Sequence, residues 1–125
     1  MEAFGGRRWV IPEGFIPPES MINANRALLS HEAACVLNTG DRDAHIAITL
    51  FFTDREPAGP YRLTVGARRT LHLRFNELEE PEKVPLGVDY ASVIESDVPI
   101  VVQHTRLDSR ASEIALLSTI AYRAD

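Results

Sequence analysis

Alternation of apolar with other side chains, in short runs separated by turns, constrains the fold of this chain more than any other feature. In residues 45–52, every second residue is apolar and would share one face of an extended strand: Ile46, Ile48, Leu50 and Phe52. Because a β-strand turns successive side chains to opposite sides, this face should point into a core. Related patterns predict further strands at 32–38, 62–65, 70–75, 91–95 and 98–102.

Turn signals interrupt these runs at short intervals. Residues 38–41 and 56–60 carry the glycine, proline and asparagine typical of turns. We expect residues 97–99 to close one segment, which puts Pro99 at the start of the next strand, where a missing N–H removes no ladder bond. Many short strands between regular turns predict an antiparallel all-β sandwich with little helix, as one domain over residues 1–125.

Helix signals are few. Asn76 is a candidate N-cap for one short turn that runs through Glu79. Residues 110–117 contain good helix formers, yet the alternating set Ile114, Leu116, Ser118, Ile120 and Tyr122 also fits a strand. Propensity does not decide between the two, and we expect a loop followed by a strand.

Composition and charge narrow the classes of function. The 125 residues suit a single domain, and the lone Cys35 forms no intrachain disulfide. No apolar run approaches the ~20 residues that a membrane-spanning helix needs, and residues 1–8 lack the apolar core of a signal peptide. We therefore expect a cytoplasmic protein that is not inserted in a membrane.

No catalytic signature is recognisable in the sequence. It contains no G-x-S-x-G elbow, no P-loop and no paired-cysteine motif, so we expect neither an enzyme nor a cofactor. His31, His72 and His104 with Glu32 could supply zinc ligands. Their spacing matches no metal motif such as H-E-x-x-H, which favours ordinary polar histidines over a metal site.

Long stretches of the chain carry a family resemblance. They are SHEAACVLNTGDRDAHI (30–46), DREPAGPYRLTVGARRTLHLRFNEL (54–78) and DYASVIESDVPIVVQHTRLDSR (89–110), together with Trp9, EGFIPP (13–18) and ALLSTIAY (115–122). These residues, over nearly the whole chain, closely resemble the soluble sensory rhodopsin transducer family.

The resemblance implies a fold, an assembly and a role. It implies a cytosolic, bacterial β-sandwich that assembles as a homotetramer and relays a signal from a membrane photoreceptor without being an enzyme. For members that have no rhodopsin, it implies the binding of a small molecule, in particular a sugar or a related metabolite. It also implies a further alternative, the binding of promoter DNA.

Two His-x-Arg pairs stand out as candidate binding residues. His72 and Arg74 lie on one predicted strand, and His104 and Arg106 lie on another. Period two places the members of each pair side by side on one face. If the two strands were neighbours, two imidazoles and two guanidiniums would converge on a site able to bind hydroxyl and carboxylate groups.

Three residues from the family-like motifs would complete such a site. Carboxylates of Glu13 and Glu32 would accept hydrogen bonds from sugar hydroxyls, and the indole of Trp9 would pack against a sugar's C–H face. The predicted ligand-binding set is therefore Trp9, Glu13, Glu32, His72, Arg74, His104 and Arg106. The alternative is that these residues form cross-strand ion pairs or contacts between subunits.

Two other functions remain open at this stage. Arg62, Arg68, Arg69 and Arg110 could form a basic patch for DNA, although a net charge of −5 and the lack of a helix-turn-helix signature oppose it. The chain could also dock on a photoreceptor's cytoplasmic face and bind no small ligand.

Overall fold

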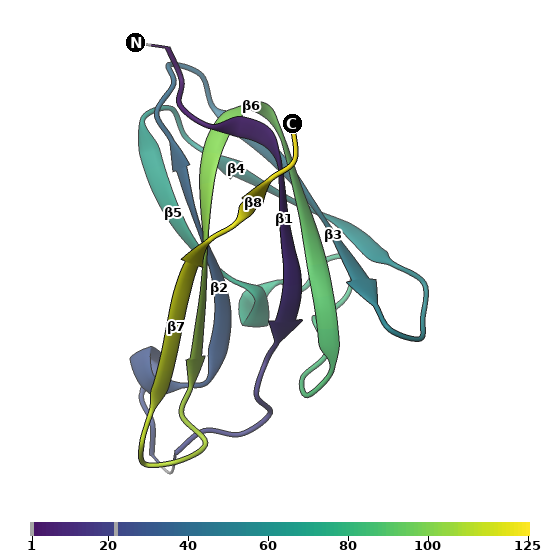
Figure 1. The fold of residues 1–125 in the computed structure, drawn as a ribbon, viewed down its shortest axis with the longest axis vertical. Helices are drawn as coiled ribbons and strands as arrows, with labels where there is room; N and C mark the ends of the chain where they lie inside the picture. The colour runs from purple at the N-terminus through teal and green to yellow at the C-terminus, as the bar shows by residue number, and fades with distance from the viewer. Residues whose placement is uncertain (1, 22) are drawn as a thin grey trace.

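Eight strands and two 3₁₀ helices make up the computed structural model, which describes residues 2–21 and 23–125 (Figure 1). The strands are β1 (Gly6–Phe15), β2 (His31–Asn38), β3 (Ala44–Phe52), β4 (Ala58–Val65), β5 (Arg69–Arg74), β6 (Asp89–Asp108), β7 (Ala115–Ile120) and β8 (Tyr122–Arg123). The 3₁₀ helices are η1 (Arg26–Leu28) and η2 (Phe75–Glu77). Within the described residues, no helix is both long and apolar enough to cross a membrane.

All the strands pair in antiparallel fashion around the 20-residue strand β6. The first half of β6 belongs to a first wing with the order β4-β3-β6-β1-β8, and its second half belongs to a second wing with the order β5-β2-β6-β7. Figure 1 shows the second wing on the left and β1 and β3 on the right. The predicted antiparallel all-β fold is confirmed, and β6 joins its two layers into one open sheet.

The prediction that residues 97–99 end a segment is wrong. The chain continues through them as part of β6, between Ser96, which pairs with Ile46, and Val101, which pairs with Leu37. Pro99 has no paired partner in the described registers. The register between β1 and β6 shifts at this point, between Gly6, which pairs with Ile100, and Arg8, which pairs with Glu95. A proline is tolerated where the strand passes from one wing to the other because its missing N–H removes no ladder bond there.

One apolar core lies between the two wings. The predicted inward face of β3 is confirmed, since Ile46, Ile48 and Leu50 are at most 2% exposed. They belong to the same buried cluster as Ala34 and Val36 of the second wing. Shared burial of apolar surface therefore holds the wings together.

The local predictions outside the strands had mixed outcomes. Arg74, not Asn76, precedes η2, and no side chain caps this helix. The amide of Asn76 instead donates to the carbonyl of Ser30 at 3.0 Å and accepts from the backbone N–H of Glu32 at 3.2 Å. The choice of a loop and then a strand for residues 110–117 is confirmed, because β7 begins at Ala115.

Candidate functional site

The two His-x-Arg pairs lie on opposite faces of the second wing. Strand β2 separates β5 from β6, and Cys35 of β2 pairs with His72 on one side and with Gln103 on the other. His72 is therefore in register with Gln103, and His104 is offset from it by one residue. Because side chains in one row of a sheet point to the same face, the prediction that the pairs converge on one surface is wrong.

The inner face of the second wing carries a buried network centred on Glu32. The Glu32 side chain is 0% exposed. Its Oε1 atom lies 2.6 Å from Nε2 of His104, and its Oε2 atom accepts from Nε of Arg106 at 2.8 Å and from the backbone N–H of Phe15 at 2.6 Å. These donors come from β6 and β1, so one carboxylate joins three strands and has partners for both oxygens.

Glu13 lies at the solvent edge of this network. Its Oε1 atom is 3.8 Å from an Arg106 guanidinium nitrogen, and its side chain is 71% exposed. Of the seven predicted site residues, the structure therefore brings together Glu13, Glu32, His104 and Arg106. An exposed ion pair at this distance contributes little to stability.

Close packing of β1 against Tyr90 places the Phe15 N–H at the network. A Cβ atom on Gly14 would lie 2.6 Å from Cζ of the Tyr90 ring, so only glycine allows this approach. The Tyr90 hydroxyl is buried and has no hydrogen-bond partner within the described part of the chain. Burial, followed by the charge of Glu32, raises the pKa of Tyr90 far above its usual range.

The remaining predicted residues lie apart from this network. Nδ1 of His72 is 3.3 Å from Sγ of Cys35, and Arg74 donates to the carbonyl of Arg26 at 2.8 Å. Burial raises the pKa of the Cys35 thiol, which opposes thiolate chemistry. Trp9 is only 4% exposed, and its indole N–H donates to the carbonyl of Gly6, so it is a core residue.

The histidines considered for zinc are not gathered either. His72 and His104 occupy opposite faces, as the register requires. In residues 2–21 and 23–125, no group of three or more His, Cys, Asp or Glu side chains is arranged to hold a metal ion.

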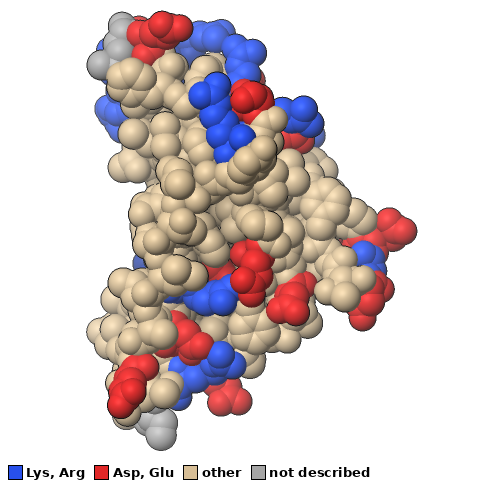
Figure 2. All heavy atoms as spheres, viewed as in Figure 1, with Lys and Arg blue, Asp and Glu red and all other residues tan. Residues whose placement is uncertain are grey.

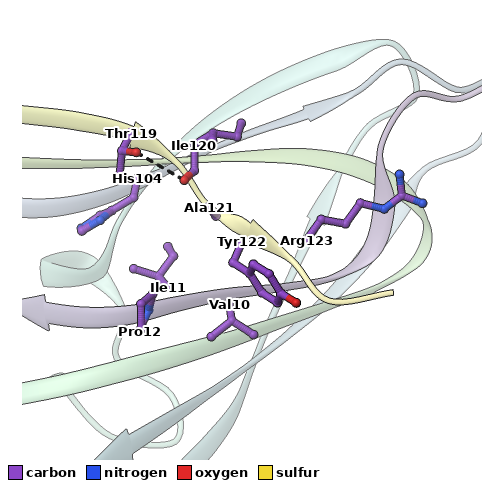
Figure 3. Close-up of a pocket in the computed structure, with 9 residues that line it drawn as sticks. All are labelled: Val10, Ile11, Pro12, His104, Thr119, Ile120, Ala121, Tyr122 and Arg123. Carbon is purple, nitrogen blue, oxygen red and sulfur yellow. Dashed lines mark hydrogen bonds between the residues drawn. The ribbon is translucent and has the colours of Figure 1, made fainter.

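A pocket of about 460 Å³, here called the crossover pocket, opens where the chain passes from β7 to β8 (Figure 3). Ala121 donates to the carbonyl of Val102 in β6, and Ala124 donates to that of Arg8 in β1, so this segment crosses from the second wing to the first. The residues that line the pocket are Val10, Ile11, Pro12, His104, Thr119, Ile120, Ala121, Tyr122 and Arg123.

His104 connects the crossover pocket to the buried network. Its ring extends into the space between β7 and residues Ile11 and Pro12 (Figure 3), while its Nε2 atom contacts Glu32. Sequence reasoning found His104 but missed the rest of the lining, because most of these side chains are apolar. An apolar residue that faces a pocket gives the same sequence signal as one that faces the core.

The arginines considered for a DNA patch do not form one patch. Arg69 pairs with Asn38 at one end of β2, whereas Arg110 follows β6 beyond the opposite end, where His31 is paired. Arg110 is also in an ion pair with Asp108 at 2.7 Å. Figure 2 shows acidic groups beside basic ones at both ends of the face in view.

Comparison with known proteins places the chain in a family. Residues 4–123 match the family model described as Anabaena sensory rhodopsin transducer. A solved structure with that same name is 51% identical, with a TM-score of 0.73, over 84% of this chain and 100% of that one. A crystal structure from Thermotoga maritima is 36% identical, with a TM-score of 0.84, over 96% of each chain.

No curated protein sequence matches the chain. The family model nevertheless extends over all eight strands, from before β1 to the end of β8. The chain therefore belongs to the sensory rhodopsin transducer family.

Proposed function

We propose that this chain is a non-enzymatic, cytosolic sensor and signal-transducer domain that binds a small molecule in the crossover pocket. One observation carries the proposal: residues 119–123 form a wall of that pocket and also belong to a segment with exposed apolar side chains. Leu116, Ile120 and Tyr122 are 69%, 61% and 68% exposed. A ligand that contacts this wall would therefore act directly on a surface suited to protein contacts.

The form of the pocket supports ligand binding. Its volume of about 460 Å³ lies in the range of about 300–1,000 Å³ that is common for small-molecule sites. The lining is mainly apolar, with a few polar groups such as His104 and Thr119. By resemblance to the family, the expected ligand is a sugar or a related metabolite.

The exposed strand β7 supports the protein-contact half of the proposal. All six of its residues are exposed, although most are apolar. Soluble proteins rarely leave an apolar edge strand uncovered, because its unpaired backbone groups can add to another sheet. We propose that β7 and β8 contact other copies in a homotetramer, or the cytoplasmic face of a membrane photoreceptor.

A thermal-shift screen with the full chain tests ligand binding. The panel contains sugars, sugar phosphates and small phenols. At about a hundred times its dissociation constant, a ligand adds ~2.7 kcal/mol of stability. The variant Thr119→Phe, which fills the pocket, should lose this gain, and Ser118→Phe, its neighbour on the opposite face, should keep it. If no compound shifts the wild-type transition, the ligand half of the proposal fails and a relay without a ligand remains.

Light scattering tests the assembly. We expect the wild-type mass to exceed that of a monomer, and Leu116→Lys to lower it because a charge replaces an exposed apolar side chain on β7. Phe51→Lys is the matched control, since Phe51 is 44% exposed on β3 of the first wing. A monomeric wild type would contradict the proposed assembly.

A further inference from the structure

We propose that the crossover pocket selects a mostly apolar ligand with a single hydroxyl or N–H group, which donates a hydrogen bond to Nδ1 of His104. The inference rests on the proposed function, because it assigns a ligand chemistry to the same pocket. It replaces the sugar that the family resemblance suggests with a different class of ligand for this pocket. Three features carry it: the tautomer of His104, the engagement of the other polar side chains, and the apolar lining.

The buried network assigns the tautomer of His104. Oε2 of Glu32 accepts from Arg106 and from the Phe15 backbone, both of which can only donate. With Glu32 ionised beside the Arg106 guanidinium, Oε1 is an acceptor as well, so the proton between Oε1 and the imidazole lies on Nε2 of His104, 2.6 Å away. Nδ1 of the neutral ring is left as an acceptor.

Nothing in the described chain uses that acceptor. The His104 side chain is only 9% exposed and its ring lines the pocket, yet Nδ1 has no hydrogen-bond partner among residues 2–21 and 23–125. Nδ1 is not among the described atoms that are both fully buried and without a partner, so it is accessible from the pocket, where a bound donor can replace water. A ligand that supplies one O–H or N–H would satisfy it.

Two of the other three polar side chains of the pocket have partners, and the third, Tyr122, is 68% exposed. The Thr119 hydroxyl is directed to the carbonyl of Ile120 at 3.5 Å (Figure 3), and Nε of Arg123 donates to Asp125 at 3.2 Å. A ligand with many hydroxyl groups would leave most of them without a partner in this site, which opposes its binding.

Apolar side chains form most of the remaining lining. They come from both sides of the pocket: Val10, Ile11 and Pro12 from β1, and Ala121 from the crossing segment. Such walls gain from burial of an aromatic or aliphatic body. The lining therefore favours a ring compound with one donor group.

Phenol and toluene form a matched pair of probes, because a hydroxyl replaces a methyl group of similar size. Titrations of the full chain, followed by backbone amide and histidine side-chain NMR, measure binding of each probe and of glucose. We expect phenol and toluene to perturb residues 10–12 and 119–123. Phenol alone should shift the Nδ1 resonance of His104, because only phenol donates a hydrogen bond.

Substitution at His104 gives a second, independent measurement. In His104→Leu, the ratio of phenol affinity to toluene affinity should fall about tenfold, whereas His72→Leu on the opposite face should leave it unchanged. The Nδ1 measurement uses the wild type, so it decides the question even if His104→Leu does not fold.

Each contrary outcome has a distinct meaning. If phenol and toluene both perturb the pocket while Nδ1 does not respond, the donor inference is overturned and the pocket remains a ligand site. Binding of glucose at the pocket with neither ring compound would overturn the inference and support the sugar class. If none of the three probes perturbs the pocket, both the inference and the ligand half of the proposed function fail.

Discussion

The two faces of the second wing carry the same dipeptide pattern and use it differently. On the inner face, His104 and Arg106 contact the fully buried Glu32. On the outer face, His72 contacts the Cys35 thiol and Arg74 donates to a backbone carbonyl. The difference comes from register, because a shift of one residue moves a side chain to the other face of a sheet. Identical motifs on nearby strands therefore do not imply one shared site.

Removal of the buried Glu32 carboxylate should give the largest difference in stability between the inner and outer faces. We expect Glu32→Ala to lower the free energy of unfolding by about 3–5 kcal/mol, because Arg106 and His104 would lose their buried partner. Arg74→Ala, the outer-face control, should change it by about 1 kcal/mol or less. Urea denaturation measures both values, and equal losses would mean that the two faces do not differ in energy.

Replacement of the two histidines compares the stability of the same two faces, with a smaller expected difference. We predict that His104→Leu destabilises the chain by about 1–3 kcal/mol, because Oε1 of Glu32 would be buried without a donor. His72→Leu removes a more exposed ring and should cost about 0.5 kcal/mol. The denaturation midpoints of the two variants measure this difference. A larger loss for His72→Leu would contradict the prediction that the inner-face histidine contributes more to stability.

The smallest expected effect concerns His31. It alternates along β2 with Ala33 and Cys35, so it lies on the outer face. Burial lowers the pKa of His31 below its ordinary 6.5. As the pH falls, the unfolded chain takes up this proton first, so the associated stability is complete above that value and is lost as the pH falls through the folded-state pKa. His31→Gln should show a weaker loss between pH 7.5 and 5 in urea denaturation, and an identical pH dependence would contradict this.

Much of the fold follows from local pattern, whereas the site depends on pairing. Alternation in residues 45–52 identifies the buried face of β3, because which side of a single strand faces the core is visible in that strand's own sequence. The prediction that a segment ends at residues 97–99 was wrong. Nothing local in the sequence indicates that β6 continues through Pro99 from one wing to the other.

The buried network was only partly predictable for the same reason. Nothing near Glu32 in the sequence indicates that its partners lie on β6 and β1, since the closest of them, Phe15, is 17 residues away. Offsets between strands depend on the whole sheet, and a change of one residue would have placed His104 on the outer face. The pocket itself is lined mainly by residues with no polar signal.

Amide chemical-shift mapping with a compound that stabilises the chain tests the central claim most directly. We predict that the perturbed residues cluster at 10–12, His104 and 119–123, around the inner-face pocket. Perturbations centred instead on His72 and Arg74, with the pocket unaffected, would contradict the claim that ligand binding belongs to the inner face.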